Sequence, residues 1–249
     1  MFNKTLKNAL KESESRCQDL EAIVQAIKKN VAFIEFTPQG IISQVNTLFL
    51  NTVGYKENEV IGQHHRMFCT NEYSQSHGYS QFWATLNLGT AVPGTFERIN
   101  ASGDIIWLEA TYFPIFDSQG QVTKLIKIAS DVTEKHNELE FQRSVYKALD
   151  KSLAIIEFTP DGEIIQANDN FLKVVGYSNQ EVVNRHHKIF CYDKFYAENP
   201  NFWSELSSGQ YKSGQFQRKD SNDNTIWLEA TYNPIFDDGG KVTRIIKFA

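Results

Sequence analysis

The heptapeptide IWLEATY at residues 106–112 recurs unchanged at residues 226–232, 120 positions later. Towards the N-terminus, IEFTP at 34–38 recurs at 156–160 and VGY at 53–55 recurs at 175–177, each 122 positions later. The offset changes between Cys69 and Phe82, which predicts a loop there, because loops tolerate changes of length. A repeat this long indicates a duplicated domain rather than a solenoid unit.

Composition places the chain among ordinary globular proteins with two domains. It has 249 residues, of which 41% are hydrophobic and 22% are charged, and its net charge is −5. The acidic balance argues against nucleic acid as a partner. No apolar run approaches the roughly 20 residues of a membrane span, and the polar N-terminus is unlike a signal peptide, so we expect no membrane span and a cytoplasmic location. The three cysteines are too widely spaced for a disulfide framework.

One repeat predicts two short strands, several short helices and three longer strands. The strands are expected at 32–36, 41–45, 95–100, 105–115 and 122–129, with Asn46 as a helix N-cap and a helix at 79–88. The fold class is therefore α+β, with two domains that each form a five-stranded antiparallel sheet carrying helices on one face. The space between helices and sheet is the expected ligand cavity. Alternation along the fourth strand places Trp107 and Glu109 on one face and Leu108 on the other.

Helical segments are expected to precede and join the two domains. The predicted organisation is an N-terminal coiled-coil-like helix (1–30), a first domain (31–133), a connecting helix (134–152) and a second domain (153–249). The N-terminal segment carries heptad-like spacing that predicts a homodimer through helices, or else a helix packed on its own domain. The residues with this spacing are Leu6, Leu10, Ser13, Cys17, Leu20, Val24 and Ile27.

Several of these motifs resemble PAS domains. The motif N..F....GY, the Phe82-Trp83 segment, the IWLEATY stretch and the Asp131-Val132-Thr133 that follows the last strand carry the resemblance. The doubled pattern HHR/K..FC…FW resembles, more narrowly, the sensor half of bacterial chemotaxis transducers that lack a membrane span. This resemblance implies a signalling protein whose C-terminal methyl-accepting domain contacts a histidine kinase and its coupling protein. That domain is not among these residues, so the chain is expected to stop before it.

The resemblance also implies candidate cofactors. A histidine of the helical segment ligates haem iron in some sensory PAS domains, so His65 and His187 are candidate haem b ligands, and metal ligands only in that case. The alternative is a capping or core-edge histidine; since neighbouring helical residues point about 100° apart, only one of each His-His pair is expected to face the cavity. FAD is favoured less, because no tryptophan lies near Gly94 or Gly214. An empty pocket is the third alternative.

Two tryptophans and the strand glutamates complete the candidate residues. Trp107 and Trp227 either donate an indole hydrogen bond into the pocket or cover the sheet surface. The glutamates Glu35, Glu157, Glu109 and Glu229 are expected to pair with Arg98 or Arg218 across the sheet.

No catalytic or phosphate-binding motif is present, so the chain is not expected to be an enzyme. The sequence favours a sensory input module of a chemotaxis or biofilm-type transducer, which couples ligand or redox state to a helix rearrangement. The alternative is a ligand-free dimerisation and relay module, for example of a histidine kinase or a cyclic-di-GMP enzyme.

Overall fold

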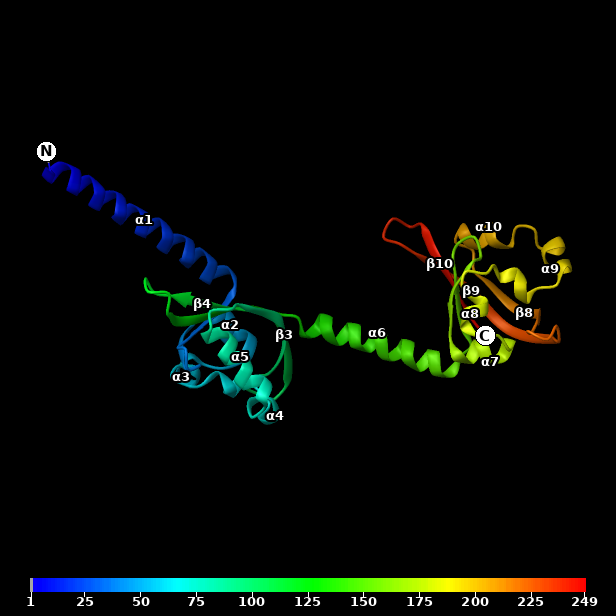
Figure 1. Cartoon of the computed structure of the whole chain (residues 1–249), viewed down its shortest axis with the longest axis horizontal. Helices are drawn as coiled ribbons and strands as arrows, with labels where there is room; N and C mark the ends of the chain where they lie inside the picture. Colours follow the sequence, from blue (N-terminus) through cyan, green and yellow to red (C-terminus); the bar gives the residue numbers. More distant parts are fainter. Residues whose placement is uncertain (1) are drawn as a thin grey trace. The chain divides into compact units, whose positions relative to one another are not determined.

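The computed structural model describes residues 2–249, with side chains from Leu6 onward. The chain divides into two compact units, Met1–Leu139 and Glu140–Ala249, and Figure 1 labels most of their helices and several of their strands. Each unit is built around its own sheet and its own hydrophobic core.

The first unit begins with a long helix and continues with two strands, a group of short helices and three strands. Its elements are α1 (Phe2–Asn30), β1 (Ala32–Phe36), β2 (Ile42–Val45), α2 (Thr47–Val53), α3 (Glu57–Val60), the 3-10 turn η1 (His65–Phe68), α4 (Asn71–Ser74), α5 (His77–Asn87), β3 (Val92–Ile99), β4 (Ile105–Phe116) and β5 (Val122–Asp131). Helix α6 (Thr133–Ser152) follows β5 directly and continues into the second unit.

The second unit repeats this order. Its elements are β6 (Ile155–Phe158), β7 (Ile164–Ala167), α7 (Asp169–Val175), α8 (Asn179–Val182), the 3-10 turn η2 (His187–Phe190), α9 (Asp193–Glu198), α10 (Phe202–Ser207), β8 (Lys212–Lys219), β9 (Thr225–Phe236) and β10 (Val242–Phe248).

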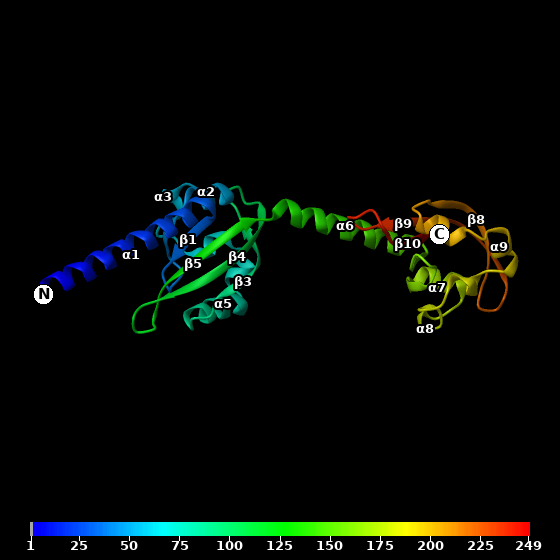
Figure 2. The ribbon, with the colours of Figure 1, turned by 90° about the horizontal axis from the view of Figure 1, so that it is seen from above.

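Each unit has one five-stranded antiparallel sheet, which confirms the predicted fold class. The strand orders are β2-β1-β5-β4-β3 and β7-β6-β10-β9-β8, and Figure 2 shows β1, β5, β4 and β3 of the first sheet from above. Strands β3 and β8 are therefore edge strands. The helical region is more divided than the sequence predicted. A 3-10 turn and an additional short helix lie between α3 and α5 in the first unit and between α8 and α10 in the second.

The core lies between the helices and the inner face of each sheet. Along β4, Leu108, Ala110 and Tyr112 are buried, while Glu109 is exposed and Trp107 is only partly covered, which confirms the predicted faces. The buried side chains of α2 and α5 join the same cluster. Burial of this apolar surface is the main stabilising contribution to each unit.

Helix α1 exposes the apolar residues that the heptad spacing singled out. Those with described exposure above 45% are Leu6, Leu10, Leu20, Val24 and Ile27. A water-exposed apolar row along a helix favours association with another helix.

Candidate functional site

A polar cluster occupies the core of the first unit, at the place where a ligand cavity was expected. His65, the first residue of η1, is fully buried. Its Nδ1 lies 3.1 Å from the hydroxyl of Tyr79 on α5, and its Nε2 lies 3.0 Å from the hydroxyl of Tyr112 on β4. His65 therefore connects the helical layer to the sheet through two hydrogen bonds.

The neighbouring histidine has a different place. His64 is the N-cap of η1, and its Nδ1 accepts a hydrogen bond from the backbone N–H of Arg66. It is partly exposed, so only one histidine of the pair faces the core, as predicted.

His65 is neutral at ordinary pH. Burial, and then the positive charges of Arg98 and Lys127, hold the pKa of His65 well below its usual value of 6.5. The hydroxyl oxygen of Tyr112 also accepts from Nη2 of Arg98 at 3.2 Å. Because a neutral imidazole has one N–H donor and one acceptor nitrogen, one of the two tyrosine hydroxyls donates to His65 and the other accepts from it.

Two buried basic side chains complete the cluster. Arg98 on β3 and Lys127 on β5 are each 2% exposed. The ammonium group of Lys127 lies 5.1 Å from the ring centroid of Tyr112 and 5.3 Å from that of Phe49, so aromatic faces are its nearest recorded partners. Burial lowers the pKa of Lys127 well below its usual range, and the charge of Arg98 lowers it further. The core therefore combines hydrogen-bonding groups with one guanidinium and a lysine whose charged form is disfavoured by burial.

The second unit contains the same cluster. His187 is buried, with Nδ1 2.8 Å from the hydroxyl of Tyr196 and Nε2 3.0 Å from the hydroxyl of Tyr232. Arg218 donates to Tyr232 at 3.1 Å, and Lys247 is 1% exposed. Burial lowers the pKa of Lys247 to about 7. The duplication has thus preserved a complete polar network and not only the apolar core.

A buried cysteine adjoins each histidine. Cys69 Sγ lies 3.8 Å from Nδ1 of His65, and Cys191 Sγ lies 3.5 Å from Nδ1 of His187. Burial raises the pKa of both thiols, that of Cys191 to about 11. Both groups are therefore protonated thiols, which are poor nucleophiles.

The described core does not fit a haem on His65 or His187 in this arrangement. Both ring nitrogens of His65 and of His187 have tyrosine hydroxyl partners, and neither histidine lines any of the pockets recorded among the described residues. A haem iron needs one unblocked imidazole nitrogen and space beside it. Haem ligation by His65 or His187 stays a prediction that a Soret band would test, and we derive no step through a cofactor.

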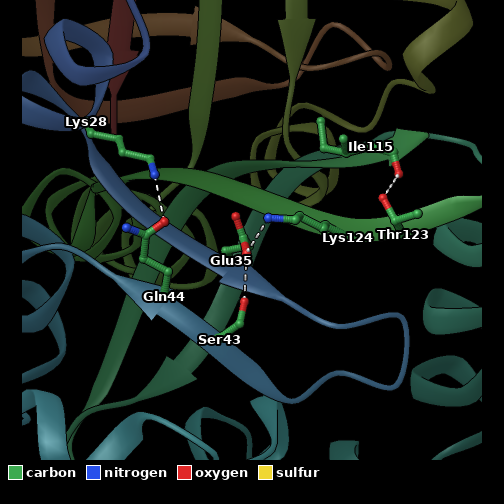
Figure 3. A network of polar contacts seen from close by, with 7 residues as sticks. All are labelled: Lys28, Glu35, Ser43, Gln44, Ile115, Thr123 and Lys124. Carbon is green, nitrogen blue, oxygen red and sulfur yellow. Dashed lines mark hydrogen bonds and ion pairs between the residues drawn. The ribbon is translucent and has the colours of Figure 1, made fainter. Parts of the chain in front are cut away.

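The strand glutamates do not pair with the predicted arginine in the first unit. Glu35 instead accepts from Lys124 at 3.2 Å and from Ser43 at 2.9 Å, as Figure 3 shows. Arg98 lies opposite Ile106 in the sheet and faces the core, whereas Glu109 is exposed on the other face. The prediction was wrong because side chains alternate between the two faces of a strand. The arginine lies on the face that packs against the helices, and the glutamates lie on the opposite face.

The same correction holds for the second unit. Glu157 accepts from Arg244 at 2.8 Å and from Gln166 at 2.8 Å. Its predicted partner, Arg218, faces the core and binds Tyr232.

Trp107 contacts the beginning of α6 and not the core. Its backbone N–H donates to Thr133 Oγ1 at 2.9 Å, and that threonine is bound in turn to Asp131. Its indole stacks on the imidazole of His136, with ring centroids 3.9 Å apart. The Asp-Val-Thr motif thus fixes the first turn of α6 to the sheet. Trp227, at the matching position, is 66% exposed and lines a surface pocket.

An asparagine fixes the opposite end of each unit. Asn46 caps α2 and accepts from the N–H of Phe33 on β1, while its amide donates to the carbonyls of Lys28 and Val31 at the end of α1. In the second unit Asn168 makes the same contacts with Ile155, Asp150 and Leu153. A single side chain therefore joins the incoming helix, the first strand and the next helix.

The sequence did not single out Tyr79, Tyr112, Arg98 or Lys127 as members of a site. The alternation along β3 could have predicted that Arg98 is buried. Arg98 is two residues from Phe96, so both side chains lie on the face that packs against the helices.

Comparison with known proteins identifies the family. A model described as "PAS domain" matches residues 29–134, and a model described as "PAS fold" matches residues 164–249. The chain belongs to the PAS family and contains two PAS domains in tandem.

The chain is also similar over most of its length to one curated protein. It is 41% identical over 228 residues, 90% of its length, to the "Biofilm dispersion protein BdlA" of Pseudomonas aeruginosa. It is 25% identical over 118 residues, 46% of its length, to the "Bacterioopsin transcriptional activator" of Halobacterium salinarum. The chain covers 54% of the first protein and 17% of the second.

Solved structures of single domains are similar to parts of the chain. A PAS domain from Colwellia psychrerythraea is 23% identical, with a TM-score of 0.42, and the match covers 46% of this chain and 98% of that one. A light-oxygen-voltage domain studied with a flavin analogue is 17% identical, with a TM-score of 0.41, and the match covers 51% and 96%.

None of the helices in the described part of the chain combines the length and apolar character required to cross a membrane. No group of three or more histidine, cysteine or acidic side chains in the described part of the chain is arranged to hold a metal ion.

Proposed function

We propose that this chain is the sensory input region of a chemotaxis or biofilm-type signal transducer, located in the cytoplasm and without catalytic activity of its own. The proposal rests on the two PAS domains of this chain and on its 41% identity to BdlA over 90% of its length. The output partners are the chemotaxis histidine kinase and its coupling protein, which a methyl-accepting domain following the PAS pair would contact.

The observation that carries the proposal is that both helices flanking the first sheet, α1 and α6, are hydrogen-bonded to it or to the residue that caps α2. Asn46 binds the last carbonyls of α1, and Thr133 binds the backbone of Trp107 at the start of α6. A change in strand position at the core is transmitted to these helices because their end turns share hydrogen bonds with the strands. Coupling of this kind requires a two-state element biased at one site and sensed at another.

The coupling is tested by replacing one hydroxyl. In the complete gene product, Thr133→Val removes the oxygen that accepts from Trp107, and we expect loss of the chemotactic or dispersal response with normal protein levels. The matched control is Thr123→Val, which removes a threonine hydroxyl from the exposed β4–β5 hairpin. A folded Thr133→Val protein with an unchanged response would refute this route.

Dimerisation through α1 is tested with a natural cysteine. Cys17 is the exposed cysteine of the described chain, whereas Cys69 and Cys191 are buried. Mild oxidation should therefore give a disulfide-linked dimer through Cys17, on the heptad seam. The control is the double variant Cys17→Ser with Ser15→Cys, which moves the thiol off the seam. Equal crosslinking at both positions would contradict a dimer through this face.

The filled core favours a second candidate, a relay that works without a core cofactor. In this case the purified protein is colourless, and its response depends on the second PAS unit only through helix contacts. An absorption band near 400 nm, lost in His65→Ala, would favour the haem sensor instead.

A further inference from the structure

Each PAS unit buries an arginine whose guanidinium is not fully satisfied. Arg98 and Arg218 are 2% and 1% exposed. Each donates from Nη1 to the carbonyl of the preceding residue and from Nη2 to a tyrosine hydroxyl, but Nε has no partner in either unit. A buried donor without an acceptor is costly, and more so when it is charged. The same unpartnered N–H in both copies is suited to an acceptor from a bound ligand.

A second buried basic residue lies in the same core as the arginine. Lys247 lies in the same core as Arg218, and the recorded salt bridges of the described residues include neither of them. Burial, and then the charge of Arg218, lowers the pKa of Lys247 to about 7, so the lysine does not compete with the arginine as a fixed positive charge. Buried charges in proteins are ordinarily paired. Arg218 is therefore a buried guanidinium without a carboxylate among the salt bridges of the described residues.

A surface pocket lies beside this arginine. In the second unit a pocket of about 670 Å³ lies between α9 and the edge strand β8, and Arg218 is among its lining residues. The first unit has a pocket of about 360 Å³ at the matching place, lined by Arg98. The larger volume is within the range of small-molecule sites.

The two pockets differ in the charges beside the arginine. Glu97 lines the pocket of the first unit, whereas Gln217 has that place in the second. The second pocket adds the cation Lys194, which pairs with Glu198 at 3.4 Å; both side chains are well exposed and line the same pocket. The pocket over Arg218 therefore has no carboxylate on the strand that carries the arginine, and it is the better anion site of the two.

The walls of the second pocket are largely aromatic and amide. The guanidinium carbon of Arg218 lies 4.2 Å from the ring centroid of Phe195 and 5.1 Å from that of Phe216. Gln215, Gln217 and Asn199 supply uncharged donors along the rim. Aromatic walls around one cation favour a ligand with a planar apolar body and a single anionic group.

We propose that the pocket between α9 and β8 binds a small aromatic carboxylate, whose oxygens accept from Arg218. Arginine binds carboxylates well because its planar N–H groups match the two oxygens. The site does not include His187 but adjoins its network through Tyr232, to which Arg218 donates. It goes beyond the proposed function and rests on that function only for the idea that the bound carboxylate is a signal. Binding itself is measured without any signalling readout.

The test is calorimetric titration of the whole chain with benzoate, and with benzamide as the neutral analogue. We expect saturable binding of one benzoate per chain and at least about tenfold weaker binding of benzamide, since loss of one charge-assisted hydrogen bond is worth about 1.4 kcal/mol or more. Equal binding of the two compounds, or no saturable binding of benzoate, would overturn the proposal. If inorganic phosphate binds as well as benzoate, the assignment to carboxylates is wrong.

Three variants locate the site. Arg218→Gln should abolish benzoate binding, while the matched Arg98→Gln should leave it unchanged. Because Arg218 is buried and its replacement can unfold the unit, the exposed Gln217→Glu provides an independent test. It introduces the carboxylate that the first unit carries at Glu97, and we expect benzoate affinity to fall about tenfold or more. Unchanged affinity in Gln217→Glu would place benzoate elsewhere and refute the site.

Discussion

The two PAS units agree closely in their buried cores and differ along their edge strands. The distance from histidine Nε2 to tyrosine hydroxyl is 3.0 Å in both, and the arginine–tyrosine distances are 3.2 and 3.1 Å. The pockets at the edge strands differ, at about 360 and 670 Å³. A buried polar network tolerates little change because every lost partner leaves an unsatisfied group, whereas the edge is free to diverge. Substitutions in the core should therefore act equally in both units.

The largest effect is expected from removal of the central hydroxyl. Tyr112→Phe and Tyr232→Phe should each lower the free energy of unfolding of their own unit by about 2–4 kcal/mol, because a histidine nitrogen and an arginine N–H both lose a buried partner. Denaturant-dependent hydrogen exchange, resolved by peptide, reports each unit separately. The control is the exposed Tyr211→Phe, for which we expect no change. A difference of more than about 1 kcal/mol between the two core variants would contradict the equivalence of the cores.

A gain in stability is expected when the buried lysine is removed. The pKa of Lys247 is lowered to about 7 in the folded protein from 10.5, mainly by burial, so the unfolded state binds the proton more tightly and stability falls as the pH drops from 10.5 towards 7. Lys247→Met should therefore stabilise the second unit by about 1–3 kcal/mol at pH 7, and Lys127→Met the first. Thermal unfolding measures both, with the exposed Lys241→Met as control. Destabilisation by either core variant would show that the ammonium has a partner in solution.

Mild acid should weaken both units in parallel. Burial lowers the folded-state pKa of His65 and His187 well below 6.5, so the unfolded chain takes up protons first and stability is lost as the pH falls below about 6.5. The expected slope is up to about 1.4 kcal/mol per pH unit for each histidine. Denaturant unfolding between pH 7.5 and 5.5 measures the slope for each unit. His65→Gln should flatten it only in the first unit; a slope that persists there would assign the effect to other groups.

The sequence predicted the sheet of each unit well because its signals are local. The turn residues and the alternation around Trp107 and Leu108 fixed the strands and their faces, and the repeat identified the second copy. The core network was missed for a physical reason: β5 carries Ile126 and Ile128 on its outer face, so alternation did not mark Lys127 as the inward residue. Its burial depends on the pairing of β5 with β1 and β4, which no local pattern encodes.

The contacts between the sheet and the helices at the ends of each unit could not be predicted from the sequence either, because they depend on tertiary packing. The Asp-Val-Thr motif was recognised by resemblance, but the place of Trp107 beside His136 depends on how β4 approaches the beginning of α6. The asparagine Asn46 was predicted as an N-cap, which is confirmed; its bonds to the end of α1 required the folded unit.

The smallest predicted effect concerns this tryptophan, and it tests where the two units differ. Trp107 stacks on His136 at 3.9 Å, whereas Trp227 is 66% exposed. His136→Ala should lower the local stability of the first turns of α6 by about 0.5–1 kcal/mol, the amount that a stacked pair contributes beyond burial. Trp227→Ala should change the stability of the second unit by less than about 0.5 kcal/mol, as surface substitutions do.

Amide exchange in the peptide that covers the start of α6 measures this effect, because a loosened first turn exchanges faster while the core strands do not. Unchanged exchange there in His136→Ala would mean that the stack adds nothing to the bond from Trp107 to Thr133. The hydroxyl of Thr133 alone would then hold α6 to the sheet, so Thr133→Val should release α6 in the first unit. Slow exchange in both variants would show that packing of β5 against β4, rather than the motif, fixes the direction in which α6 leaves the sheet.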